Sequence, residues 1–443
     1  MDRRNFFKAS AGTAAVLSGI SGCRVEKIQK GIGPGSVTDG GKLGGMTLED
    51  LRERYFFDLF DDFLPFLDKY VIDHEYGGFM CNTKPDGTNV STSKGAWYEG
   101  RGIWVYSYLY NKIDPDPKHL EVARKSVDFI MKHRPSDDSF WEKSYTKEGV
   151  ASGGPGDIYC NLFIANGLAE YSKAEGNEEY WDIAKDIFIS CIRRYDSDDY
   201  RYAVYYGPEA EHEQPPRVLG HWMVILRLAS QMLEFRSDPD IEAIASRTVD
   251  AIMNHHLNPA YGLMNEVMKH DLTRADPPFD QFSYTGHAIE TLWMVLYEAA
   301  RTGDRALFDD AGRVFRRHVE VSWDDVYGGA FRCLDNVDEN VWKTDKVLWL
   351  QEEVLIGTLF MIEHTGDPWA KEWFSRMFTY VQDKFPQKQY GFPLWILGSD
   401  RKVTFDPERS RVGNFHHPRH LMLNLLSLER MIQRGGSVSE LFT

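Results

Sequence analysis

The sequence predicts an all-α fold, a closed ring of six helical hairpins that forms an (α/α)6 barrel. The first observation is a set of six polar residues that recur at intervals of 58 to 66 positions. Turn signals, either glycine or Asp-Pro, and loops rich in aromatic residues recur in phase with this set. Self-similarity at a fixed period indicates one supersecondary unit that is repeated. The six polar residues are Arg101, Tyr159, His221, His287, Glu353 and His416.

Each repeated unit is expected to hold an inner helix, a tight turn and an outer helix. In the stretch 285–301, Leu292 and Leu296 belong to an apolar stripe with the helical period, and Gly303 then ends the helix. Because no βαβ alternation is evident, we expect the polar repeat residues to converge on the axis of a helical ring. Other inner helices are expected at 157–174, 221–235, 346–364 and 418–433, and outer helices at stretches such as 177–194 and 240–255.

Residues 1–22 resemble an export signal. Arg3-Arg4 precedes a short apolar stretch at 9–22, as in a twin-arginine signal peptide. Ile20-Ser21-Gly22-Cys23 resembles a bacterial lipoprotein cleavage box, with Cys23 as the lipidated first residue. The alternative is an ordinary signal peptide followed by an incidental cysteine. The apolar stretch is too short to span a bilayer, so we expect membrane attachment through the lipid alone.

The remaining boundaries follow from composition. Residues 23–46 are polar and rich in glycine, and we expect them to form a flexible tether. The barrel is expected over 47–436 and a short tail over 437–443. Together these features predict an exported lipoprotein in the periplasm or at the outer membrane of a bacterium.

Composition excludes some classes of function. The chain has 443 residues, a formal net charge of −16 and a pI near 5.4, which speaks against nucleic-acid binding because phosphates require a basic surface. Aromatic residues make up 14% of the chain, which suits both a packed core and a sugar cleft. The cysteines lack CxxC spacing, so we expect no metal and no other cofactor. The cysteines expected to be mostly buried thiols are Cys81, Cys160, Cys191 and Cys333.

Two histidines at predicted helix starts are the candidate acid/base groups. His287 lies in the first turn of its helix, where the helix dipole disfavours the imidazolium form. A neutral imidazole is a competent general base near neutral pH. Glu290 shares the same helix face and could orient the ring or hold a substrate hydroxyl. The structural alternative for such a histidine is a helix cap or a satisfied core residue.

The second histidine lies two repeats farther along the ring. His416 precedes Pro418, a residue that favours helix starts, and is expected to begin the last inner helix. Two repeats of a six-fold ring separate His416 from His287 by roughly a third of a turn. The two imidazoles could therefore face one ligand from different sides, as proton removal and return with inversion requires.

Three further residues suit sugar binding. Trp349 and Glu353 are four positions apart and share a helix face, which would set an aromatic platform beside a carboxylate. Arg101 could hold substrate oxygens or a developing enediolate. The structural alternatives are a core tryptophan, solvated glutamates and a structural ion pair.

Several blocks of sequence resemble the N-acylglucosamine 2-epimerase family, which also includes cellobiose 2-epimerases and mannose or aldose–ketose isomerases. The blocks are WYEGRGIWVYSYLYN at 97–111, GHAIETLW at 286–293, KVLWLQEE at 346–353 and FHHPRHLM at 415–422. The resemblance covers nearly all of the predicted barrel and implies an (α/α)6 barrel with His287 and His416 as the acid/base pair. The pocket residues that it implies are Arg101, Tyr159, His221, Glu290, Trp349 and Glu353.

The chain departs from the family pattern at several positions expected to contact the sugar. Glu99 stands where the family usually has Gln, and Arg217 stands where it has Asn. Leu348-Trp349 supplies one tryptophan where family members often carry two, and the segment 391–395 matches only loosely. Because both histidines are retained, we expect the chemistry to be kept while the identity of the sugar stays open.

The resemblance implies a sugar 2-epimerase. A reducing sugar, either N-acylglucosamine or a cellobiose-type disaccharide, would lose its C2 proton to one histidine and regain a proton from the other through an enediolate. An aldose–ketose isomerase on the same scaffold, a glycoside or unsaturated-uronyl hydrolase that uses Asp157, Glu290 and Glu353, and a non-catalytic glycan-binding lipoprotein are the alternatives. The sequence leaves a homodimer open.

Overall fold

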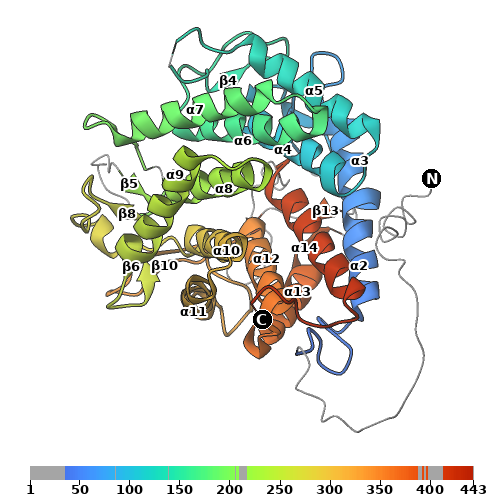
Figure 1. The fold of residues 1–443 in the computed structure, drawn as a ribbon, viewed down its shortest axis with the longest axis vertical. Coiled ribbons are helices and arrows are strands. Elements are labelled where there is room, and N and C mark those ends of the chain that lie inside the picture. Colours follow the sequence, from blue (N-terminus) through green and yellow to red (C-terminus); the bar gives the residue numbers. More distant parts are fainter. Residues whose placement is uncertain are drawn as a thin grey trace, which may run out of the picture.

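The computed structural model confirms the predicted (α/α)6 barrel. It describes residues 35–84, 86–137, 139–204, 206–208, 217–387, 392–393, 396–397 and 413–442. The inner helices are α4 (Ala96–Lys112), α6 (Ile158–Glu175), α8 (Leu219–Phe235), α10 (Thr285–Thr302), α12 (Leu348–Thr365) and α14 (His416–Gln433). Each inner helix packs on the next along the chain, and α14 contacts α4 to close the ring (Figure 1).

The outer layer consists of helices that alternate with the inner ones along the chain. Its members are α2 (Leu48–Phe57), continued by η1 (Asp58–Phe63), α3 (Leu64–Phe66) and η2 (Leu67–Val71), then α5 (Pro117–Lys132), α7 (Glu179–Asp196), α9 (Pro239–Asp250) with η3 (Ala251–His256), α11 (Arg305–Ser322) and α13 (Pro368–Lys384). The later outer helices pack on the inner helix that precedes them, whereas α2 packs on α14 (Figure 1). The two ends of the barrel sequence therefore build the sixth hairpin together.

Short antiparallel strand pairs lead into the inner helices. The pairs are β1 (Asn82–Thr83) with β2 (Asn89–Ser91), β3 (Lys94–Gly95) with β4 (Ser144–Tyr145), β5 (Arg217–Val218) with β8 (Val267–Met268), β6 (Leu257–Asn258) with β7 (Leu263–Met264), β9 (Cys333–Asn336) with β10 (Val341–Lys343), β11 (Lys346–Val347) with β14 (Ile396–Leu397), and β12 (Pro386–Gln387) with β13 (Phe392–Pro393). Strands β3, β5 and β11 run directly into α4, α8 and α12. These pairs thus anchor the N-terminal ends of three inner helices.

The predicted turn glycines end three of the inner helices. Gly176, Gly303 and Gly366 adopt φ angles of 70°, 70° and 64° at the C-caps of α6, α10 and α12. This left-handed conformation is costly for residues that carry a Cβ, so glycine is the natural choice there. The sequence pattern therefore located these helix ends correctly.

The inner helices are buried on nearly every face because neighbours enclose them on all sides, whereas the outer helices bury one stripe. Leu292, Trp293 and Leu296 of α10 are at most 1% exposed. Burial of each such side chain stabilises the fold by about 1.5–3 kcal/mol. The free cysteines follow the expectation in the main: three are buried and one is half-buried.

The described ends of the chain differ from the expected tether and tail. Val37, in the stretch expected to be flexible, is fully buried, and its amide donates to the carbonyl of Gly436 at 3.0 Å. Val438 in turn donates to Gly35 at 2.9 Å. These paired backbone groups and the apolar side chains hold residues 35–46 and the C-terminal segment against the barrel. The expected signal segment and Cys23 lie outside the described residues.

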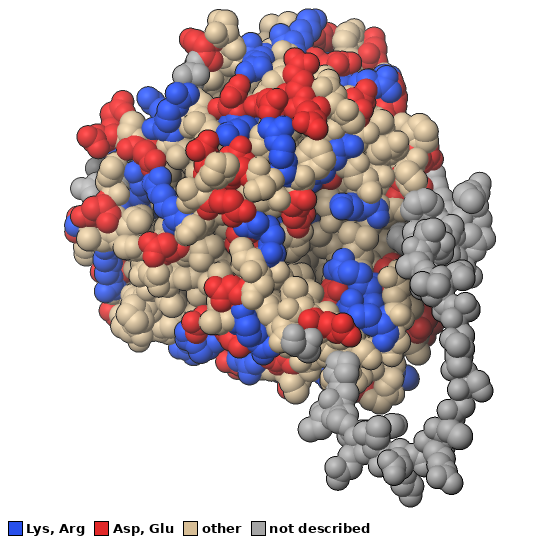
Figure 2. Space-filling view, viewed as in Figure 1, with Lys and Arg blue, Asp and Glu red and all other residues tan. Residues whose placement is uncertain are grey.

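The surface carries charges of both signs. Figure 2 shows acidic and basic side chains interspersed over the visible face. None of the described helices combines the length and apolar character that a membrane crossing would need.

Because two histidines are buried, we expect the free energy of unfolding to fall at acidic pH. Burial lowers the pKa of both His256 and His318 to about 4, although each ring also bonds a backbone carbonyl. In the unfolded chain both would titrate near pH 6.5, so the unfolded state binds more protons as the pH falls below that value. Each ring should then reduce the free energy of unfolding by up to about 1.4 kcal/mol per pH unit between 6.5 and 4.

The measurement is urea unfolding between pH 7.5 and 5. His318→Gln should unfold at lower urea but show a smaller pH slope than the wild type. His74→Gln, which changes a histidine whose side chain is 55% exposed, serves as the control and should keep the wild-type slope. A slope unchanged by His318→Gln would contradict the assignment.

Candidate functional site

The repeat residues gather at one end of the ring. They lie at or near the N-terminal ends of the inner helices, because each polar position follows a loop or strand pair by a similar number of residues. The placement is Arg101 in the second turn of α4, Tyr159 in α6, His221 in α8, His287 in α10, Trp349 and Glu353 in α12 and His416 as the first residue of α14. The helical repeat thus correctly indicated that these residues share one end of the barrel.

Trp349 brings the two candidate histidines together. Its indole lies 6.1 Å from the ring of His287 and 5.3 Å from the ring of His416, measured between ring centroids. Gly286 makes this packing possible, since a Cβ there would come within 2.6 Å of the indole. The histidine side chains are 16% and 13% exposed, in contrast with the fully buried Glu353. Both imidazoles therefore border one partly accessible space.

The carboxylate beside His287 is Glu266, which sequence reasoning missed. Its Oε1 lies 2.9 Å from Nδ1 of His287 and accepts a hydrogen bond from the Tyr206 hydroxyl at 2.8 Å. Burial, followed by the charge of Glu266, raises the pKa of Tyr206 well above its ordinary value, so this hydroxyl stays a donor. With the proton on Nδ1, His287 also donates to Glu266, which leaves Nε2 for proton transfer. No local pattern marks Glu266, which precedes β8 in a loop.

Glu290 serves the other histidine. One role considered from sequence was to orient His287, but its Oε1 accepts a hydrogen bond from Nη2 of Arg419 at 2.6 Å and lies 3.9 Å from Nδ1 of His416. The same Nη2 also contacts Glu353. Arg419 follows His416 by three residues on α14, so both lie on one face of that helix. This spacing was the sequence signal that could have indicated Arg419 as a site residue.

His416 sits in a tightly paired cluster. Its Nδ1 lies 2.9 Å from Glu353 Oε1 and 3.1 Å from Nη2 of Arg419. The indole N–H of Trp293 donates to the other oxygen of Glu353 at 2.6 Å. Burial lowers the pKa of His416 well below its ordinary value; Glu290 opposes this effect, and the charges of Arg419 and Arg101 add to it. His416 is therefore a neutral imidazole near neutral pH.

Aromatic rings surround Arg101. Its guanidinium lies 4.6 Å from the Trp97 ring, 4.1 Å from Phe163 and 4.6 Å from Phe415. Such packing holds a flexible side chain in one orientation and keeps its charge close to the histidine end of the barrel. Its influence on His416 places it on the same side of the site.

Tyr159 and His221 form the wall between α6 and α8. Their rings lie 4.4 Å apart, and Tyr159 also packs on Trp97 at 5.1 Å. His221 has no exposed surface, and burial lowers its pKa well below the ordinary value, with the charges of Arg217 and His287 adding to the effect. His221 is therefore a neutral residue that supports Tyr159 and is less accessible than either candidate acid/base histidine.

Three clusters of described residues have the composition of a metal site, and in the two that join α12 to α14 the contacts favour ion pairs. Burial alone would raise the pKa of Glu352, yet His417 and His420 overcome it and bring the pKa to about 2. Nδ1 of His417 contacts Glu352 directly, as a hydrogen-bonded imidazolium does. The second cluster, Glu290 with Glu353 and His416, already surrounds the guanidinium described above.

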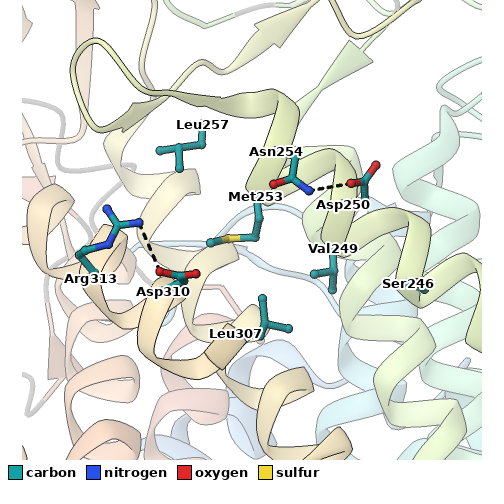
Figure 3. A pocket seen from close by; sticks show the side chains of 9 residues that line it. All are labelled: Ser246, Val249, Asp250, Met253, Asn254, Leu257, Leu307, Asp310 and Arg313. Atoms are coloured by element: carbon teal, nitrogen blue, oxygen red, sulfur yellow. Dashed lines mark hydrogen bonds and ion pairs between the residues drawn. The ribbon is translucent and has the colours of Figure 1, made fainter. Parts of the chain in front are cut away.

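A surface groove elsewhere on the barrel does not belong to this site. It lies between η3 and α11, where Met253, Leu257 and Leu307 form its apolar lining (Figure 3). Polar contacts border it, among them Asn254 with Asp250 at 2.7 Å. These residues come from outer helices, whereas the histidines begin inner ones.

Comparisons with known proteins identify the family and the fold of the chain. The family model described as N-acylglucosamine 2-epimerase (GlcNAc 2-epimerase) matches residues 77–417. The N-acylglucosamine 2-epimerase of Bos taurus is 24% identical over 396 residues, which are 84% of this chain and 90% of the bovine protein. Two solved structures share the fold: cellobiose 2-epimerase from Bacillus thermoamylovorans B4167 (TM-score 0.75, 17% identity, 85% of this chain and 99% of that chain) and D-mannose isomerase (TM-score 0.70, 16% identity, 86% and 97%).

The close packing at Gly220 predicts a site-specific effect of a single methyl group. A Cβ at this position would overlap the Tyr159 hydroxyl and lie 3.0 Å from Cε1 of His287. We expect Gly220→Ala to lower the free energy of unfolding by about 1–3 kcal/mol and to displace the His287 ring, which NMR titration of that imidazole would detect.

Gly312→Ala is the matched control. Its Cβ would lie 3.3 Å from the terminal methyl of Met361, a flexible group, within α11. Because alanine favours helix by up to about 1 kcal/mol, the control should be neutral or stabilising and should leave His287 unchanged. Equal effects of the two variants on His287 would contradict the packing argument.

Proposed function

The chain belongs to the N-acylglucosamine 2-epimerase family and is an enzyme of the isomerase class, and we propose that it inverts C2 of a reducing sugar by proton transfer between two histidines. The observation that carries this proposal is the placement of His287 and His416 around Trp349, each with a carboxylate at Nδ1. Two bases that border one accessible space can address opposite faces of one carbon atom.

The proposed reaction begins with the open-chain sugar. The C1 carbonyl makes the C2 proton acidic, and one imidazole removes it through its free Nε2. An enediolate forms, and the positive charge of Arg101 suits stabilisation of the developing oxyanion. The second imidazole then delivers a proton to the opposite face of C2, which yields the epimer and leaves the number of atoms and electrons unchanged.

The surroundings of the histidines suit this exchange. Glu266 beside His287 and Glu353 beside His416 each stabilise the imidazolium that a proton transfer creates. The low pKa of His416 keeps this ring neutral beforehand, so it is ready to accept a proton. Proton transfer by a positioned side chain typically contributes about 10²–10⁴-fold to the rate.

The carboxylates of the site favour epimerisation over glycoside hydrolysis. A hydrolase needs a pair of acidic groups at the scissile bond, one of them protonated. Here Glu290 and Glu353 both accept hydrogen bonds from Arg419, and although burial raises the pKa of Glu353, the guanidinium opposes that rise. The observed pairs thus leave histidines, not carboxylic acids, as the candidate proton carriers.

Two sugar classes fit the proposal. The bovine relative is named for N-acylglucosamine, and a relative from Dictyoglomus turgidum, 22% identical, is named cellobiose 2-epimerase. We propose an N-acylglucosamine or a cellobiose-type disaccharide as substrate. An aldose–ketose isomerisation, in which the proton goes to C1, is the alternative within the same geometry.

The decisive experiment incubates the purified protein with a panel of reducing sugars in deuterated water. Deuterium should enter C2, and NMR should show the C2 epimer with the carbon skeleton of the sugar intact. A ketose product would indicate isomerisation, a shorter sugar would indicate hydrolysis, and an absence of exchange with every sugar would contradict the proposal.

The histidine variants test the same mechanism. His287→Ala and His416→Ala should each reduce C2 exchange about 10²–10⁴-fold while circular dichroism shows an intact helical fold. His255→Ala, which changes a surface histidine, should exchange at the wild-type rate. Wild-type exchange in either site variant would exclude that histidine as a proton carrier.

We also propose that the protein is exported and attached to a bacterial membrane by a lipid on Cys23. The support is the sequence pattern Arg3-Arg4 followed by the apolar stretch and the Ile-Ser-Gly-Cys box. Labelled palmitate should enter the wild type and not Cys23→Ser, and the variant should leave the membrane fraction. An unlabelled wild type would contradict this proposal.

A further inference from the structure

A buried arginine inside the barrel, Arg227, forms no ion pair or hydrogen bond with an acidic side chain among the described residues. Arg227, on α8, is 5% exposed, and none of its three guanidinium nitrogens has a hydrogen-bond partner among the residues that the structure describes. Arg419 and Arg301 each bind two carboxylates instead. Within the described interior, Arg227 is therefore a cation whose N–H groups no side chain or carbonyl satisfies.

Aromatic side chains enclose this guanidinium. It lies 5.4 Å from the Trp293 ring and 4.7 Å from the Tyr297 ring, both on α10. Tyr108 of α4 is also near, because burial raises its pKa while the charge of Arg227 opposes that rise. Glu234, two turns farther along α8, instead accepts a hydrogen bond from Tyr297. Rings attract the cation through their faces, but they offer no acceptor for its N–H groups.

A guanidinium stays charged at every pH that a folded protein experiences. Burial of such a charge is unfavourable unless an anion or several hydrogen bonds compensate it. We propose that Arg227 binds a small monovalent anion, of the halide or formate class, inside the barrel and apart from the sugar site. The N–H edge of a guanidinium is the part that binds anions, and it can hold one or two acceptor atoms in its plane.

The position along the barrel separates this anion from the sugar. His221 and Arg227 both lie on α8, with Arg227 six residues farther from the histidine end. Trp293 is 1% exposed and contacts the guanidiniums of both Arg419 and Arg227. This indole lies between Arg419, beside the candidate sugar site, and Arg227 at the proposed anion site. The enclosed surroundings and the single cation favour a small ion with one negative charge.

The proposed site connects to the histidine cluster through Trp293. The indole N–H donates to Oε2 of Glu353 at 2.6 Å, and the other oxygen of Glu353 lies 2.9 Å from His416. An anion that neutralises Arg227 would help to hold the indole in place. The proposal does not depend on the reaction catalysed, because its primary readout is stability.

The test follows thermal unfolding of the protein while sodium gluconate, whose anion is much larger than a halide, is replaced by sodium bromide at constant ionic strength. The wild-type midpoint should rise saturably by about 2 °C or more. Arg227→Met should lose this rise. Arg236→Met, the matched control, removes a half-exposed guanidinium that also packs on a tryptophan, and should keep it.

Crystals of the wild type soaked in bromide provide a second readout, which is needed if Arg227→Met does not fold. Anomalous scattering should place bromide within hydrogen-bond distance of the Arg227 guanidinium. Three outcomes would each overturn the proposal and leave water as the partner of Arg227. They are a wild-type unfolding midpoint that does not change with bromide, the same rise of the midpoint in Arg227→Met, and bromide bound only at other places.

Discussion

The geometry of the proposed acid/base pair depends on one buried cation, Arg419. Its Nη2 binds Glu290 and Glu353 and lies 3.1 Å from Nδ1 of His416. These residues come from α10, α12 and α14, so the guanidinium links three neighbouring inner helices at the site. Loss of one partner from such a buried pair typically costs about 3–5 kcal/mol. The interaction that holds this part of the ring therefore also adds to burial, which lowers the pKa of His416.

The two histidines are held by different means. His287 has a carboxylate that a tyrosine hydroxyl also binds, whereas His416 has a carboxylate that a guanidinium and an indole N–H also bind. A nearby cation disfavours a second positive charge, so Arg419 opposes protonation of His416. The site is therefore electrostatically asymmetric, although both rings pack against the same indole. Such asymmetry suits a reaction in which one imidazole donates a proton while the other accepts one.

The architecture explains why the site lies at this end. The N-terminal ends of the inner helices receive loops and strand pairs that supply Glu266 and Tyr206, and glycines there admit close packing of Trp349 and His287. The other ends of α10 and α12 carry ion pairs, such as Arg301 with Glu298 and Arg430 with Glu363. Polar groups at that end largely bind one another, whereas at the histidine end the two candidate imidazoles keep 16% and 13% of their surface exposed.

Much of the fold could be predicted because its signals are local. Apolar periodicity located the inner helices to within about two residues at most ends, and Gly176, Gly303 and Gly366 marked three of their C-termini. The repeat period also indicated that the polar positions share one end of the ring. The polar, glycine-rich composition of residues 35–46 predicts a flexible tether. The contact of Val37 with the C-terminal segment instead holds them against the barrel, and no local pattern encodes that contact.

By itself, the sequence determined the helical ring, the end at which its polar residues gather and the two histidines as candidates. Only the tertiary structure decided the partners of these histidines: Glu266 and Tyr206 for His287, and Arg419 with Glu353 for His416. The physical reason is that helix periodicity acts over a few residues, whereas these contacts join different inner helices and loops. Packing of the closed ring selects which charged groups meet, and that selection sets the pKa of His416.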